Sequence, residues 1–139
     1  MGTETRVEVA ARVESLGTVR AFVEDACRRA GADAESCFDL KLAVDEACTN
    51  IIEHGYAGRP DGTIAISCDA TDDTLRVTIL DHGRSFTPGS VAPADVDSDW
   101  KDRPVGGLGW HFILNSVDAV DYVPDPAGNR LILTKRSRK

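Results

Sequence analysis

No stretch of about twenty consecutive apolar residues, the length of a membrane-crossing helix, occurs in this sequence. The chain also begins without the charged and then apolar segment that is typical of an export leader. These two absences predict a cytoplasmic protein with no membrane partner.

Clustered positive charge is missing as well. The 16 Lys and Arg residues are outnumbered by 23 Asp and Glu residues, and the formal net charge at pH 7 is -7. Nucleic-acid-binding proteins grip the phosphate backbone with clustered basic side chains, whereas here the basic residues are scattered except in the terminal run 135–139. Such a run is usually solvated. The sequence therefore predicts no nucleic-acid partner.

The cysteines lack the spacing of metal ligands. They lie ten or more positions apart, with no C-x-x-C pair and no neighbouring His, and are Cys27, Cys37, Cys48 and Cys68. Zinc sites need closely spaced thiolate or imidazole ligands. We therefore expect reduced thiols that fill space in the core, and we expect the same of Cys48.

The composition that is present fits one globular domain. Of the 139 residues, 42% are hydrophobic and 28% are charged, and a chain of that size can close a core of its own. No internal repeat or low-complexity segment divides it. We expect a single domain over residues 1–139.

The spacing of apolar residues predicts both strands and helices. Charged and apolar residues alternate over 5–9, as in a short edge strand. The other elements follow from the same patterns: helices over about 15–30, 34–53 and 108–116, and strands over 63–68, 75–80, 119–123 and 130–135. This order predicts an α/β fold, a two-layer sandwich with helices on one face of a mixed, largely antiparallel sheet.

The helix expected over 34–53 carries two adjoining stripes. At about 100° per residue, its apolar stripe must face the sheet and consists of Leu40, Val44, Ala47 and Ile51. The neighbouring stripe is polar and consists of Glu46, Asn50, Glu53 and His54. Taken alone, Glu46 and Asn50 would be a solvated helical pair. Their place at the edge of the core makes them candidates for chemistry.

Two further segments predict a nucleotide site. Asp81-His82-Gly83 ends the strand expected over 75–80, and Gly106-Gly107-Leu108-Gly109 opens the helix expected over 108–116. A strand-end carboxylate can accept a hydrogen bond from a purine amine, and the amides of a glycine cluster at a helix start can hold phosphate oxygens.

These segments resemble the N, G1 and G2 boxes of the GHKL (Bergerat-fold) ATPases in order and spacing. The N box corresponds to Glu46 through Asn50, the G1 box to Asp81-His82-Gly83 followed by Phe86, and the G2 box to 106–109. More narrowly, residues 43–56 together with 107–109 resemble the RsbW-like anti-sigma-factor serine kinases of bacteria. The resemblance extends from the first expected helix to the end of the chain and implies the Bergerat ATP-binding fold.

The resemblance also implies roles for individual residues. Glu46 would be the base that takes the hydroxyl proton of the acceptor. Asn50 would bind Mg²⁺ through its side-chain oxygen, and His54 would orient the metal shell or the helix end. Asp81 would accept from the adenine amine, and Gly83 would let backbone lie close to the base.

The remaining implied roles lie later in the chain. Phe86 belongs to the G1 segment, and Gly106, Gly107, Leu108 and Gly109 would bind the phosphates. Thr134 would support the adenine through water, or it is simply a β-branched strand residue. Residues 84–105 hold three prolines and little periodicity, which predicts an ATP lid because such long irregular stretches in compact domains usually serve function.

The implied function is that of an ATP-dependent serine/threonine protein kinase acting as an anti-sigma factor. It would use ATP and Mg²⁺, bind a sigma factor, phosphorylate an antagonist protein of the STAS type, and form a homodimer. The alternative is an ATP-gated anti-sigma or adaptor module without kinase activity, against which Glu46 speaks because binding alone needs no base. A sensor histidine kinase is not expected, since 139 residues leave no room for a dimerising helical hairpin.

Overall fold

The computed structural model describes residues 3–56, 61–83 and 113–137. In chain order the strands are β1 (Thr3–Ala10), β2 (Thr63–Thr71), β3 (Thr74–Asp81), β4 (Ala119–Val123) and β5 (Asn129–Arg136). The helical elements are a 3-10 turn η1 (Val13–Ser15), the helices α1 (Leu16–Ala30) and α2 (Ala34–Asn50), and a π-helical turn η2 (Ile51–Gly55). Residues 113–116 are also helical and precede β4.

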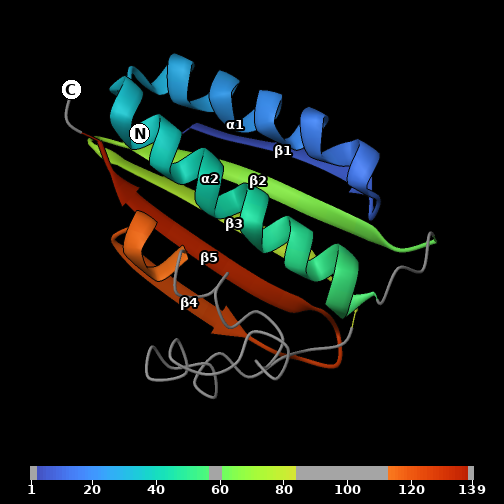
Figure 1. The fold of residues 1–139 in the computed structure, drawn as a ribbon. Coiled ribbons are helices and arrows are strands. Elements are labelled where there is room, and N and C mark those ends of the chain that lie inside the picture. The colour runs from blue at the N-terminus through green and yellow to red at the C-terminus, as the bar shows by residue number, and fades with distance from the viewer. Residues whose placement is uncertain (1–2, 57–60, 84–112, 138–139) are drawn as a thin grey trace, which may run out of the picture.

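The strands form one antiparallel sheet in the order β1-β2-β3-β5-β4. Helices α1 and α2 lie side by side on one face of this sheet, with the C-terminal end of α2 above the end where β3 stops and β5 begins (Figure 1). The two-layer sandwich and the edge position of β1 are therefore confirmed. No described pair of strands is parallel, so the sheet is antiparallel rather than mixed in this part of the chain.

Local signals in the sequence determine where the two long helices begin and end. Helix α1 buries Leu16, Val19, Val23 and Cys27 and stops at Gly31, whose left-handed φ of 73° suits glycine. Helix α2 begins after Asp33, whose side chain accepts from the Ser36 amide. Both boundaries agree with the helices expected over about 15–30 and from 34 onward.

Side chains alternate between the two faces of each strand. On β3 the inward residues are Leu75, Val77, Ile79 and Asp81, all buried. The last inward position is thus a carboxylate, and the register of the sheet pairs Asp81 with Asn129 of β5. This register places a polar pair at the end of an otherwise apolar core.

Several expected boundaries differ from the structure, and β1 (Thr3–Ala10) is longer than the expected 5–9. The α-helix ends at Asn50 and continues as the π turn η2, where the Tyr56 amide donates to the Ile51 carbonyl at 2.8 Å. Residues 69–74, which lie between the strands expected over 63–68 and 75–80, form a hairpin whose turn is only two residues long, and Asp72 in this turn adopts a φ of 53°. Both strands are correspondingly longer than the alternation suggested, and β5 gains Asn129 at its start.

The cysteines are free, and Cys27, Cys48 and Cys68 are buried while Cys37 is half-buried. Cys48, at 0% exposure, lies within the core, as expected. Along the described parts of the chain, no helix combines the length and hydrophobicity that crossing a bilayer requires.

Candidate functional site

Asp81 is a buried carboxylate at the end of β3, with 3% of its surface exposed. Its Oδ1 atom accepts from the Gly83 amide at 2.8 Å and from the Asn129 side-chain amide at 3.2 Å. Burial raises the pKa of Asp81, and the hydrogen bonds from Asn129 and Gly83 oppose that shift. The Oδ2 atom has no hydrogen-bond partner among the described residues, so one acceptor remains available to a ligand.

Asn129 holds the turn that follows Asp81. It is 4% exposed, and its Nδ2 atom donates both to Asp81 Oδ1 and, at 2.9 Å, to the Gly83 carbonyl. Asn129 lies just before the strand expected over 130–135 and was not among the site residues expected from the sequence. Its role depends on the pairing of β3 with β5, which no local pattern reveals.

Gly83 lies against the end of the α2 segment. A Cβ atom at this position would lie 2.7 Å from the carbonyl carbon and oxygen of Gly55. A side chain there would therefore force the two backbones apart. This contact brings the turn after β3 against the helix that carries Glu46 and Asn50.

Asn50 is the last residue of α2 and is only 7% exposed. Its side-chain amide makes no hydrogen bond to any of the residues that the structure describes. Buried amides almost always have a partner, and leaving one without a partner costs roughly 1–3 kcal/mol. The buried amide without a partner in the described part of the chain makes the end of α2 a candidate ligand position.

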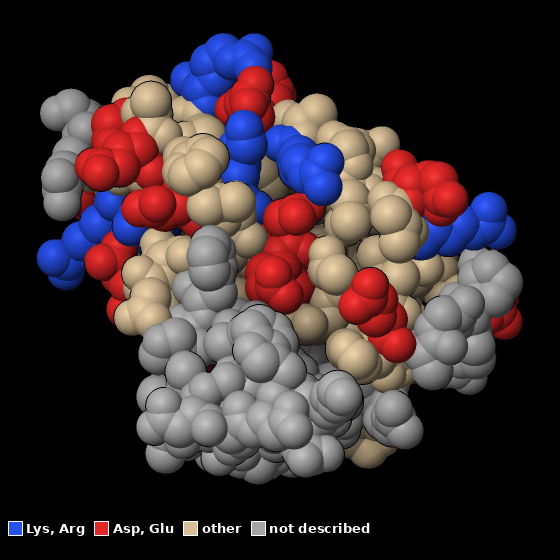
Figure 2. Space-filling view, viewed as in Figure 1, with Lys and Arg blue, Asp and Glu red and all other residues tan. Residues whose placement is uncertain are grey.

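Glu46 lies one helical turn before Asn50 and is half-buried. Burial is the main cause that raises the pKa of Glu46, and the charges of Asp45 and Glu53 raise it further. No ion pair or hydrogen bond joins Glu46 to the described residues. The acidic side chains over the C-terminal half of α2 are visible in Figure 2.

The expected site residues on the described chain fall into two groups. Asp81 and Gly83 meet the end of the helix that carries Glu46 and Asn50, with His54 half-buried in η2. Thr134 does not join them. It lies five positions beyond Asn129, pairs with the exposed Arg76, and points to the opposite face of the sheet. The adenine-supporting role expected for Thr134 therefore does not fit this geometry.

Several expected site residues lie outside the described residues. They are Phe86, the whole glycine cluster Gly106-Gly107-Leu108-Gly109, and the ATP lid expected over 84–105.

Residues 9–135 match the family model described as the histidine kinase-like ATPase domain. The chain belongs to this family. It is 34% identical to the serine-protein kinase RsbW of Halalkalibacterium halodurans, over 91% of this chain and 79% of that protein. It is 32% identical to the serine-protein kinase RsbW of Listeria monocytogenes, over 97% and 88% respectively. The resemblance to RsbW-like kinases is confirmed, and membership of an ATPase family implies that ATP is the nucleotide.

Solved structures show the same fold. The RsbU and RsbW domains of Rv1364c from Mycobacterium tuberculosis align with a TM-score of 0.71 at 23% identity, covering 99% of this chain and 33% of that one. The chain thus spans about a third of that solved chain. The mycobacterial sensor histidine kinase MprB aligns with a TM-score of 0.54 at 18% identity, over 96% of this chain and 99% of that one.

Proposed function

We propose that this chain is an ATP-dependent serine/threonine protein kinase that acts as an anti-sigma factor. It would bind a sigma factor and phosphorylate a STAS-type antagonist protein, which then controls release of the sigma factor. The observation that carries the proposal is the pair Glu46 and Asn50, a half-buried carboxylate and a buried amide that make no hydrogen bond to the described residues. The serine-protein kinases of which the chain is a relative support the same activity.

The Asp81 carboxylate fits an adenine ring. Its Oδ1 atom is already held by Gly83 and Asn129, whereas Oδ2 lacks a partner in the described part of the chain. The exocyclic amine of adenine is a donor and would satisfy this buried acceptor. A guanine base presents a carbonyl oxygen at the same position and would face the carboxylate with like partial charge.

The residues at the end of α2 fit a magnesium ion. Asn50 offers an amide oxygen, the hard type of ligand that Mg²⁺ prefers, and the ion takes most of its other ligands from phosphates and water. When bound, the ion would neutralise negative charge on the phosphates. His54 would orient this helix end. The family resemblance assigns phosphate contacts to Gly106, Gly107, Leu108 and Gly109, and a place in the same site to Phe86.

Glu46 would supply the base. In the proposed step the hydroxyl oxygen of a Ser or Thr in the antagonist bonds to the γ-phosphorus of ATP, the bond from that phosphorus to the β,γ-bridging oxygen breaks, and ADP leaves. The hydroxyl proton passes to the Glu46 carboxylate. The raised pKa of Glu46 strengthens it as a proton acceptor relative to a solvated glutamate.

The assembly and location follow from the same proposal. We propose a homodimer, because β1 is an edge strand that pairs only with β2 among the described strands and can meet a second copy. Sedimentation that stays monomeric at high micromolar concentration would rule this out. Because a sigma factor acts in transcription, the proposal places the protein in the cytoplasm.

Incubation with γ-labelled ATP and Mg²⁺ tests the activity. Purified protein is mixed with candidate antagonist proteins, and acid-stable phosphoserine or phosphothreonine on an antagonist is the expected product. If ATP and sigma-factor binding are intact but no antagonist is labelled, the chain is a gated binding module and the kinase proposal fails.

A further inference from the structure

Tyr56 follows the π turn at the end of the α2 segment and is buried, with 4% of its surface exposed. The turn contains one residue more than an α-helical turn, because the Tyr56 amide donates to the Ile51 carbonyl five positions back at 2.8 Å. The helix thus ends at Tyr56, whose ring packs against Gly62. A Cβ atom added to Gly62 would lie 2.5 Å from this ring. The ring therefore fills the junction between the helix end and β2.

The hydroxyl of Tyr56 is a hydrogen-bonded bridge between two strand ends. It donates to the Thr63 carbonyl at 2.6 Å, at the start of β2, and accepts from the His82 amide at 2.8 Å, directly after β3. Its donor and acceptor capacities are thus both used inside the protein. One buried oxygen joins the end of the α2 segment to the turn that carries Asp81.

That turn is held from three sides. Asn129 holds Asp81 and Gly83 from β5, the Gly55 backbone packs against Gly83, and the Tyr56 hydroxyl holds the His82 amide. Asn129 belongs to the sheet and fixes the turn relative to the sheet. Tyr56 instead continues directly from the helix, so its hydrogen bond fixes the turn relative to Glu46 and Asn50.

We propose that Tyr56 is a positioning residue. It sets the distance between the Asp81 carboxylate, which would bind adenine, and the end of α2, which would bind the phosphates. The inference rests on the proposed function, because it assumes that one nucleotide reaches from Asp81 to Asn50 and Glu46. Adenosine would contact only the Asp81 half of the site. ATP would contact both halves, and its affinity depends on their relative placement.

The test compares ATP with adenosine in the variant Tyr56→Phe, which keeps the ring and removes only the bridging hydroxyl. We expect the affinity for Mg-ATP to fall about three- to tenfold, the size of one hydrogen bond, while adenosine affinity changes less than about twofold. At saturating ATP, the rate of transfer to the antagonist should fall by a similar factor. Calorimetry measures both affinities, and labelled ATP measures the transfer.

Ser36→Ala is the matched control. Ser36 is 4% exposed, and its hydroxyl donates to the Arg136 carbonyl at 3.2 Å at the opposite end of α2. It should lower stability as Tyr56→Phe does but leave the ratio of ATP to adenosine affinity unchanged. Equal losses of ATP and adenosine affinity in Tyr56→Phe, or no loss of either, would overturn the positioning role. A wild type that binds neither nucleotide would instead overturn the proposed function.

If Tyr56→Phe does not fold, hydrogen exchange in the wild type tests the positioning role of Tyr56. The amide proton to follow is that of His82, which is bound to the Tyr56 hydroxyl. A non-hydrolysable ATP analogue with Mg²⁺ should slow its exchange more than adenosine does, because only the analogue draws the two halves together. Equal protection by the two ligands would overturn the inference.

Discussion

The polar side chains at the two ends of α2 differ in whether they have hydrogen-bond partners among the described residues. At the N-terminal end, Asp33 accepts from the Ser36 amide at 3.0 Å and from the Ser137 hydroxyl at 3.1 Å. The Ser36 hydroxyl in turn donates to the Arg136 carbonyl at 3.2 Å. This network ties the start of the helix to the end of β5, and each of these polar groups has a partner.

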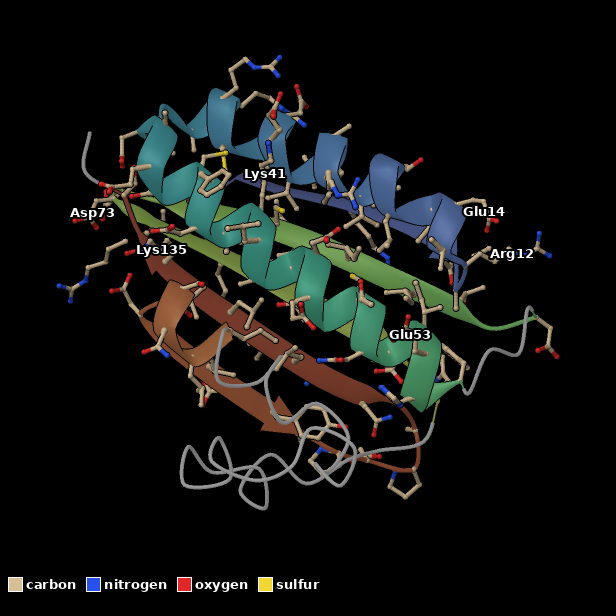
Figure 3. The ribbon with its side chains drawn as sticks, in the orientation of Figure 1. Arg12, Glu14, Lys41, Glu53, Asp73 and Lys135 are labelled. Atoms are coloured by element: carbon tan, nitrogen blue, oxygen red, sulfur yellow. The ribbon has the colours of Figure 1, made fainter. Side chains whose placement is uncertain are left out.

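The C-terminal end leaves polar groups open. Asn50 and Glu46 make no hydrogen bond to the described residues, and Asp81 keeps one oxygen without a partner in that part of the chain. Figure 3 shows the two ends, with Glu53 near the C-terminal end of α2 and with Asp73 and Lys135 at the opposite end of the molecule. At that end, the Nζ atom of Lys135 lies 3.2 Å from the Oδ2 atom of Asp39, so these two charged groups form an ion pair.

The contrast separates structure from function within one helix. A buried polar group with a partner is neutral or stabilising, whereas one without a partner lowers stability and persists where a ligand completes it. Mutations at the N-terminal end should therefore lower the free energy of unfolding. Mutations at the C-terminal end should instead lower nucleotide affinity or the rate of phosphoryl transfer. Four substitutions test this division, beginning with the largest expected effect.

Glu46→Gln should reduce transfer to the antagonist by roughly a hundredfold or more, the usual loss when a general base is removed. ATP affinity should stay within about twofold, because the amide keeps the shape of the side chain. Glu35→Gln, an exposed position in the first turn of α2, is the matched control and should retain full transfer. Undiminished transfer by Glu46→Gln would remove this residue from the chemistry.

The pH dependence of wild-type transfer gives a second check on Glu46. The base must be ionised, and its pKa is raised above the ordinary value of 4.5. The rate should therefore rise with pH through an apparent pKa above 4.5 and level off once Glu46 is ionised. A rate that does not change between pH 4.5 and neutrality, with the fold intact, would contradict this assignment.

Asp81→Asn should weaken ATP binding by about tenfold or more, because a donor amide can then face the adenine amine. Stability should behave differently. Burial raises the pKa of Asp81 above its ordinary value of 3.8. The contribution of Asp81 to the stability of the fold is therefore complete below pH 3.8 and is lost as the pH rises through the raised pKa. Near neutral pH the variant should be at least as stable as the wild type. Calorimetry that finds equal ATP affinity would refute the adenine assignment.

Asn50→Ala should lower Mg-ATP affinity by about tenfold, the size of one interaction with a charged group. Its free energy of unfolding should stay the same or rise, because the lost amide has no partner in the described structure. Ser36→Ala, which loses a satisfied hydroxyl, should instead lose about 1 kcal/mol. Urea unfolding compares the two, and a larger loss in Asn50→Ala would mean that this amide has a structural role.

Asp33→Ala should have the smallest effect on function. Loss of the cap should lower the free energy of unfolding by about 1 kcal/mol, and ATP affinity should not change. Urea unfolding and calorimetry on the same sample measure both quantities. A fall in ATP affinity would show that the two ends of α2 are energetically linked, which would break the division between them.

The elements that could be predicted from the sequence are those with local signals. Periodic apolar residues, the cap at Asp33 and the stop at Gly31 lie within a few residues of the boundaries they set, so α1 and the start of α2 were predicted correctly. The stripe that places Glu46 and Asn50 at the edge of the core follows from helical geometry alone. Asp81 was identified as a candidate site residue because it directly follows the strand expected over 75–80.

How these elements pack against one another depends on contacts that form only in the folded protein. Asn129 lies beside Asp81 of the candidate site through the register of β5, and Thr134 points to the other face because side chains alternate at every residue. The π turn ends at Tyr56, and the hydroxyl partners of Tyr56 come later in the chain, at Thr63 at the start of β2 and at His82 directly after β3. Such contacts join residues distant in sequence, and no local propensity encodes the geometry that they impose.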